Sequence, residues 1–137
     1  MKKLLNTSMI YFILALAAGV FYREFTKWNN YTGKTTLGIV HTHLFVLGVL
    51  LFLIVALFCD KHNNLLQNNL FQKFFVLYNI ALPFMTFMFL IRGTIQVLNI
   101  TISHTTNAII SGIAGISHIF ISAVLFLLFL SLKKVVK

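Results

Sequence analysis

Two histidines lie two residues apart inside an apolar stretch of the chain. His41 and His43 belong to the segment GIVHTHLFVLG, which runs from Gly38 to Gly48. An ionisable side chain in such a stretch is costly and usually functional, and it should face the interior of a helix bundle. Residues two apart on a helix point roughly 200° away from each other. We therefore expect the two imidazoles to face different neighbours.

Two more candidates, Arg92 and His118, lie in later apolar stretches. With about 1.5 Å of rise per residue, both fall in the same half of the membrane as His41 and His43, the half away from the chain termini. Glycines accompany the imidazoles at helical spacing and would let a backbone or a flat ligand come close. These are Gly38 and Gly48 beside His41, and Gly115 beside His118.

Buried imidazoles beside small residues and a cation predict a haem site. Haem iron takes axial imidazoles, and a guanidinium binds carboxylates such as haem propionates in a bidentate manner. The predicted cofactor is haem b, in the half of the bundle away from the termini, between the second and fourth apolar stretches. The predicted site consists of His41, His43 and His118 as ligands, Arg92 as propionate partner, and Gly38, Gly48 and Gly115 as space.

Two alternatives remain open at this stage. Imidazole also suits copper and zinc, so a divalent-metal site could use histidines among His41, His43, His104 and His118. His104 and His118 cannot share one ion, because they would lie about 21 Å apart along a helix. The protein could instead be a cofactor-free transporter or accessory subunit that relays protons through its histidines.

Acidic residues are too few for most hydrolytic chemistry. Glu24 and Asp60 are the only carboxylates in the chain, and we expect them on opposite sides of the membrane. No nucleophile–base arrangement or carboxylate pair is present, so we predict no hydrolytic active site. Whether the protein is an enzyme of another kind stays open, and a haem would give it an electron-transfer role.

The elements that must hold these residues are long and apolar. Of 137 residues, 59% are apolar and 9% are charged, whereas soluble domains carry about 25% charged residues. The sequence predicts an all-α integral membrane four-helix bundle, with residues 1–137 as one domain. The expected helices cover approximately residues 4–22, 35–58, 74–98 and 105–132, each near the length that crosses a bilayer.

Charge at the ends of these stretches predicts the orientation. Four spans put both termini on one side, and that side collects seven of the eleven cations. An excess of Lys and Arg marks the cytoplasmic side, so we expect both termini in the cytoplasm. The seven are Lys2, Lys3, Lys61, Lys73, Lys133, Lys134 and Lys137. The net charge of +9 then points to lipid headgroups and not to nucleic acid.

The stretch from Val40 to Gly48 resembles the His-x-His-Leu-x-x-Leu-Gly pattern of small bacterial membrane proteins related to subunit I of haem–copper oxidases. Phe21-Tyr22-Arg23-Glu24 and the segment from Ser111 to His118 are also similar to a four-helix family of this kind. In the large subunit, twelve helices form three similar groups of four, and one His-x-His helix ligates two haems. The catalytic copper site needs an adjacent histidine pair, which this sequence lacks, so no oxygen reduction by one chain is implied.

This resemblance implies a multi-pass protein of the bacterial cytoplasmic membrane with a respiratory or redox role and a redox partner. It also implies a homo-oligomer, a trimer by analogy with the three groups of four helices. In such a trimer, His41 would face one haem and His43 another across a subunit boundary.

Overall fold

The structure is a computed structural model that describes residues 1–135. Lys137, one of the cations counted above, lies outside the described residues. The elements are α1 (Lys2–Trp28), α2 (Leu37–His43), the π-helix η1 (Leu44–Leu50), α3 (Leu51–Lys61), the short 3₁₀-helix η2 (Asn63–Leu65), α4 (Asn69–Val97) and α5 (His104–Val135). Because α2, η1 and α3 follow one another without a break, we call Leu37–Lys61 the composite helix.

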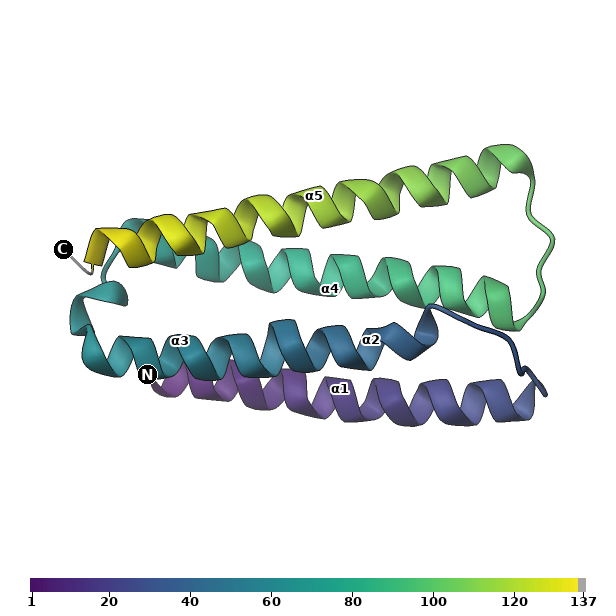
Figure 1. Ribbon diagram of the computed structural model, residues 1–137, viewed down its shortest axis with the longest axis horizontal. Coiled ribbons are helices and arrows are strands. Elements are labelled where there is room, and N and C mark those ends of the chain that lie inside the picture. The colour runs from purple at the N-terminus through teal and green to yellow at the C-terminus, as the bar shows by residue number, and fades with distance from the viewer. Residues whose placement is uncertain (136–137) are drawn as a thin grey trace.

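Four helices in the described part of the chain are long and apolar enough to cross a membrane. The predictions of an all-α fold and of four helices that could span a membrane are therefore confirmed. The helices are antiparallel in sequence order, and α1 begins at the same end at which α5 finishes (Figure 1). We call this the terminal end. The opposite end, which holds the loops after α1 and after α4, is the distal end.

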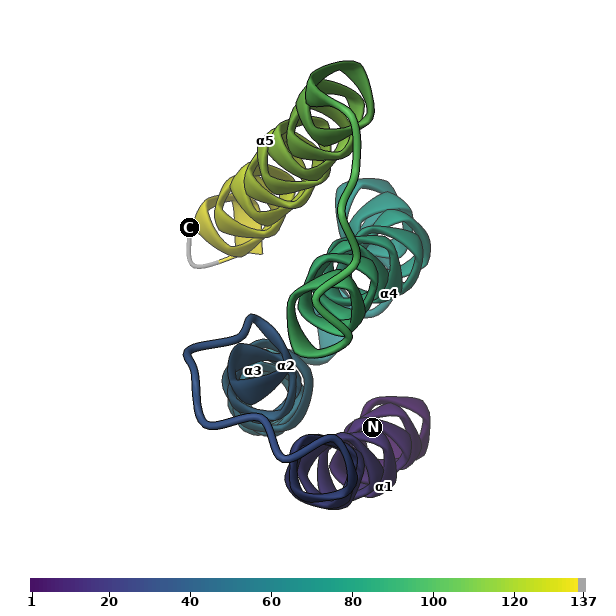
Figure 2. The same cartoon turned by 90° about the vertical axis from the view of Figure 1, so that its right-hand side faces the viewer.

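The four helices form an open arc and not a closed bundle. Seen end-on, α1 and α5 lie at opposite extremes of the arc, with the composite helix and α4 between them (Figure 2). The principal contacts join α1 to the composite helix, the composite helix to α4, and α4 to α5. In a bilayer the lipid tails are as apolar as leucine, so no hydrophobic force closes the arc.

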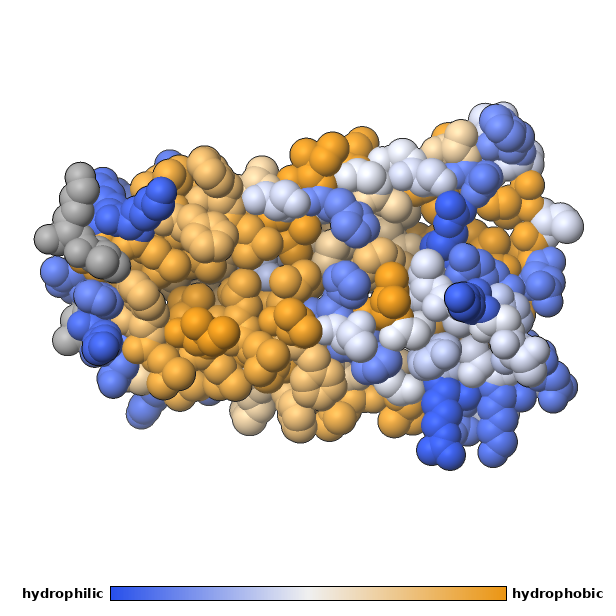
Figure 3. Space-filling model, viewed as in Figure 1, coloured by the Kyte–Doolittle hydropathy of each residue, from blue (hydrophilic) through white to orange (hydrophobic). Residues whose placement is uncertain are grey.

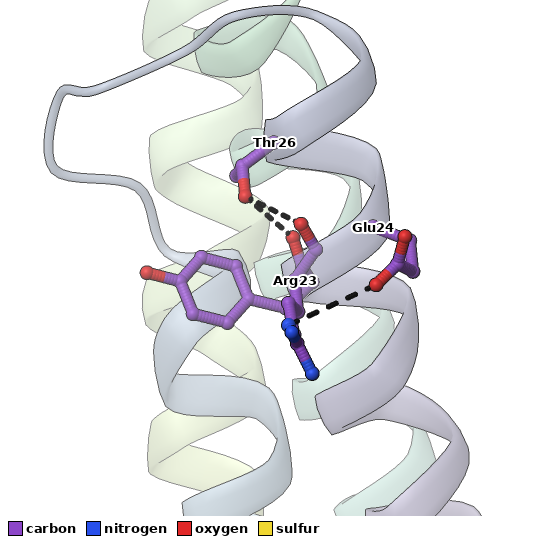
Figure 4. Close-up of polar contacts among 4 residues, drawn as sticks. Arg23, Glu24 and Thr26 are labelled. Carbon is purple, nitrogen blue, oxygen red and sulfur yellow. Dashed lines mark hydrogen bonds and ion pairs between the residues drawn. The ribbon is translucent and has the colours of Figure 1, made fainter.

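Two helices extend five or more residues beyond the predicted bounds. Residues 23–28, expected in a loop, form the last turns of α1, and α4 begins five residues before the expected start at 74. Local polar bonds support the end of α1 (Figure 4): Thr26 Oγ1 donates to the carbonyls of Tyr22 and Arg23, and Arg23 Nε lies 3.8 Å from Glu24 Oε1. These bonds satisfy polar groups locally, which the apolar pattern alone does not reveal.

Polar surface is concentrated toward the distal end. The half of the molecule near the terminal end presents mostly apolar side chains between its charged tips, whereas hydrophilic surface reaches from the distal end toward the middle (Figure 3). The apolar half contains the fully buried rings of Phe52, Phe74 and Tyr78. His41, His43, Arg92 and His118, the polar residues singled out from the sequence, lie in the distal half of their helices.

The composite helix begins in direct contact with the backbone of α4. Thr35 Oγ1 donates to the carbonyl of Gly93 at 3.2 Å, and Thr36 Oγ1 donates to the carbonyl of Phe89 at 2.8 Å. A Cβ at Gly93 would lie 2.6 Å from the backbone nitrogen of Leu37. Only glycine allows this approach, so Gly93 fixes the height and side at which the second span meets α4.

The π-helical segment that follows His43 receives bonds from both neighbouring helices. Tyr78 of α4 donates its hydroxyl to the carbonyl of Leu47 at 2.9 Å, and Ser8 of α1 donates to the carbonyl of Val49 at 3.1 Å. A π-helix bonds i to i+5, and such segments are frequent at functional sites. The segment is therefore held from two sides immediately beyond the histidine.

The glycine contact yields a stability prediction with a matched control. Gly93→Ala should lower the stability of the protein by about 1–3 kcal/mol, because the new methyl group overlaps Leu37. Gly19→Ala should be neutral or stabilising by roughly 0.5–1 kcal/mol, since alanine favours a helix and a Cβ there would lie at an ordinary contact distance of 3.8 Å from His41. Thermal unfolding midpoints in detergent check both. Equal midpoints for the two variants would contradict the close contact.

Candidate functional site

Two imidazoles from different helices meet the same aromatic ring. His43, the last residue of α2, lies edge-on to Phe89 of α4 with ring centroids 4.9 Å apart. His118 of α5 lies edge-on to the same ring at 5.3 Å. The two centroid distances place the imidazoles within about 10 Å of each other. The structure thus brings together one predicted ligand from the second span and one from the fourth.

Both imidazoles have the same hydrogen bond. His43 Nδ1 lies 2.8 Å from the carbonyl oxygen of Ile39, and His118 Nδ1 lies 2.8 Å from that of Ala114. A carbonyl oxygen only accepts, so each Nδ1 carries the proton, and in the neutral ring Nε2 keeps its lone pair. Metal-ligating histidines are oriented in this way, with the second nitrogen donating to a carbonyl or carboxylate. Both rings are thereby prepared to bind through Nε2.

His41 has different surroundings. Its ring stacks on Tyr22 of α1, with centroids 6.5 Å apart and planes 14° from parallel. A Cβ at Gly19 would lie 3.8 Å from this imidazole. His41 therefore faces α1 while His43 faces α4, which confirms that the two histidines have different neighbours. His41 Nδ1 is buried and has no hydrogen-bond partner among the described residues.

The three glycines expected to leave room for a flat ligand divide into two kinds. A Cβ at Gly38 would lie 3.3 Å from the ring of Tyr22, and one at Gly48 would lie 2.6 Å from Tyr11. Tyrosines of α1 already fill these spaces, so the two glycines serve the packing of α1 on the composite helix. Gly115 is open, since nothing lies within 4 Å of a Cβ built there.

Arg92 links α4 to α5 near the distal end. Its guanidinium donates to Asn107 Oδ1 through Nη1 and to Ser111 Oγ, 2.9 Å away, through Nη2. Both partners are neutral. The sequence placed Arg92 in the same half of the protein as His118, and the structure shows it bonded to the helix that carries His118.

An open cavity of about 610 Å³, which we call the distal cup, lies beside Arg92 at the distal end. It is bounded by the end of α4, the start of α5 and the loop that leads into α2. Its polar lining residues are Tyr31, Lys34, Arg92, Gln96, Asn99 and Asn107. The cup is thus rich in cationic and amide side chains.

The remaining histidines stand apart from this region. His104 is exposed at the first residue of α5, and the ring of His62 packs against Phe58 near the terminal end. Within residues 1–135, no group of three or more His, Cys, Asp or Glu side chains is placed to hold a metal ion. The described part of one chain therefore offers at most two neighbouring imidazoles, those of His43 and His118.

Sequence reasoning missed Phe89, the ring that His43 and His118 share. A signal existed: Phe89 lies three residues before Arg92 and seven before Gln96, so helical spacing places all three on one stripe. Phenylalanine is common in this chain, with 15 copies, and this one did not stand out. The π-helix after His43 had no recognisable sequence signal.

Comparison with known proteins gives one match. The sequence model of a family described as "Protein of unknown function (DUF2871)" matches residues 1–135. Searches of curated proteins and of solved structures found no match to the chain. Because the family model covers nearly the whole sequence, the protein belongs to the DUF2871 family.

Proposed function

We propose that the protein binds haem b in the membrane, with His43 and His118 as ligands of the iron. The observation that carries this proposal is that one imidazole on α2 and one on α5 have the same surroundings. Each ring meets Phe89 and each donates Nδ1–H to its own helix, which leaves Nε2 as the ligating atom. Bis-histidine ligation between helices suits a haem that transfers electrons.

The number of available ligands favours haem over zinc. Porphyrin itself supplies four nitrogens, so the iron needs one or two axial ligands from the protein. Zinc sites take at least three protein ligands, and the described residues contain no such group. Two oriented imidazoles are therefore sufficient for haem and insufficient for a typical zinc site in one chain.

The surface next to His118 suits a flat apolar group. Neither Gly112 nor Gly115 has a neighbour within 4 Å of a Cβ, and His118 is itself exposed on α5. Arg92 has guanidinium N–H groups beyond the two that bond α5, and one of these would pair with a propionate. Phe89, which contacts both imidazoles, would supply an apolar surface beside the site. When bound, haem b would supply one-electron oxidation and reduction.

The sequence supports the same proposal. The His-x-His helix resembles the haem-ligating helix of haem–copper oxidases, and we propose a redox role with an external redox partner on this basis. The π-helix directly after His43 adds support, because such segments are frequent where a helix holds a functional group.

We further propose that copies of the chain assemble through α5, as a trimer by analogy with the oxidase subunit. The most apolar part of α5 is 22% buried in the single chain, the same share as in α1 and half the 44% of α4, and of these two open helices α5 is the one that exposes an imidazole. An exposed imidazole in the apolar span is costly when it faces lipid. A second copy on this face would cover His118 and the open glycines.

The charge distribution supports cytoplasmic termini in a bacterial cytoplasmic membrane. Lysines at the terminal end of the described chain are Lys2, Lys3, Lys61, Lys73, Lys133 and Lys134. The distal end has Arg23, Lys27, Lys34 and Arg92. This excess follows the positive-inside rule and would put the haem in the outer half of the bilayer.

Four variants, each with one histidine replaced by phenylalanine, test the haem site. We expect His43→Phe and His118→Phe to remove the absorption bands of a low-spin haem, because each loses one axial nitrogen. His41→Phe keeps a ring against Tyr22, and His104→Phe lies far away, so both should retain the bands. Optical spectra of reduced and oxidised protein, purified in detergent with added haemin, measure this. A colourless wild-type protein would rule out the proposal.

Native mass spectrometry tests the assembly. The wild-type protein should appear as an oligomer, with three chains expected. Gly115→Leu should reduce the oligomer at least tenfold relative to monomer, since it adds bulk only where α5 is open. Val20→Leu, on the exposed side of α1, is the matched control and should leave the distribution unchanged. A monomeric wild type would contradict the assembly.

Cysteine labelling tests the orientation. With the native thiol removed by Cys59→Ala, Thr32→Cys at the distal end should react with a membrane-impermeant maleimide in intact cells. Asn64→Cys, in the connection at the terminal end, should react only after the membrane is broken. The reverse pattern would place the termini outside.

A further inference from the structure

The distal cup contains positive charge with no acid to balance it. Lys34 and Arg92 both line the cavity, and none of its lining residues is Asp or Glu. The two acids of the chain lie elsewhere: Glu24 pairs with Arg23 on α1, and Asp60 lies near the end of α3 at the terminal end. Neither is a lining residue of the cup.

Two of the three amide side chains that line the cup use their oxygens in hydrogen bonds to the protein. Gln96 Oε1 accepts from the backbone nitrogen of Thr36 at 2.9 Å, and Asn107 Oδ1 accepts from the guanidinium of Arg92. A backbone N–H and a guanidinium can only donate, so the oxygen of each amide must occupy these bonds. The NH₂ groups of Gln96 and Asn107 are therefore the parts left to donate to a ligand.

The cup is held in place by further contacts of its rim. Tyr31 donates its hydroxyl to the carbonyl of Lys34 at 2.9 Å, which closes the loop that carries the lysine. Asn99, two residues after the end of α4, has a left-handed conformation with φ of 50°, and Ile100 N donates to the carbonyl of Ile95 at 3.1 Å. Asparagine adopts this conformation more easily than most residues. The donors thus sit on fixed backbone.

We propose that the distal cup is a binding site for a phosphate group. The oxygens of a phosphate accept hydrogen bonds, so a phosphate site must supply donors. Charged donors such as guanidinium and ammonium form the strongest of these bonds. The cup offers two cations and the NH₂ groups of Gln96 and Asn107 at the end of the spans, the level at which lipid headgroups lie. The phosphate belongs either to an anionic phospholipid or to a free anion. This site does not depend on haem.

The test uses the full-length chain with His43→Phe and His118→Phe, so that haem propionates, which have similar chemistry, are absent. Two probes distinguish the sources. Inorganic phosphate is titrated by calorimetry in a detergent without charge. Phosphatidylglycerol and phosphatidylcholine are compared by native mass spectrometry. Saturable binding of inorganic phosphate identifies a free anion, and retention of phosphatidylglycerol over phosphatidylcholine identifies a lipid.

Asn107→Asp and Gln96→Glu are the decisive variants. Each keeps the oxygen that Arg92 or Thr36 needs, and each replaces the donating NH₂ with a carboxylate oxygen that repels phosphate. Binding of the probe that the parent retains should weaken at least tenfold in either variant, and also in Lys34→Gln, a loop change that leaves the helices intact. Lys27→Gln, a cation outside the cup, should bind as the parent does.

Three results would overturn the proposal. The first is that neither probe binds the parent chain. The second is that Asn107→Asp, Gln96→Glu and Lys34→Gln all bind the probe as the parent does. The third is that Lys27→Gln weakens binding as much as Lys34→Gln, which would mean that diffuse surface charge attracts the probe. Optical spectra decide the haem proposal separately, so failure of one proposal is distinguishable from failure of the other.

Discussion

Every polar group that enters the apolar spans must be satisfied by the protein, because hydrocarbon offers no hydrogen bonds. The chain meets this constraint mostly within single helices. Thr86 and Ser122 donate to the carbonyl four residues earlier, and the imidazoles of His43 and His118 follow the same rule. For a hydroxyl this bond is complete. For an imidazole this bond satisfies Nδ1 and leaves the lone pair of Nε2 without a partner inside the same helix.

Bonds between helices follow from the same constraint and determine where these imidazoles lie. The Thr36 hydroxyl donates to a carbonyl of α4 on the distal side of His43. The Tyr78 hydroxyl of α4 donates to a carbonyl of the composite helix on the other side of His43. Apolar packing alone specifies little in a bilayer, since lipid competes on equal terms. The register of the composite helix against α4 therefore rests on these polar contacts and on Gly93. The open arc is consistent with this view, because α5 closes against α4 alone over most of its length.

The sequence predicted what depends on length, hydropathy and helical period. These properties gave the four spans, the shared half of the membrane and the divergence of His41 from His43. It could not assign the glycines, because Gly48 and Gly115 look alike until the neighbouring helix is known: Tyr11 fills the space beside one, and nothing lies beside the other. The contacts of Phe89 and the shape of the distal cup likewise depend on how α4 packs against α5. The π-helix depends on bonds from Ser8 and Tyr78, which come from other helices.

Two imidazoles show that the described chain does not satisfy itself. His41 has a buried Nδ1 without a partner, a state that costs about 1–3 kcal/mol. His118 is exposed on an apolar helix beside open glycines, where lipid cannot replace a polar partner. The first histidine faces α1 and the second faces outward from α5, so one additional group cannot easily serve both. A cofactor or a second copy at His118 would therefore leave the Nδ1 of His41 without a partner, because His41 packs against Tyr22 of α1.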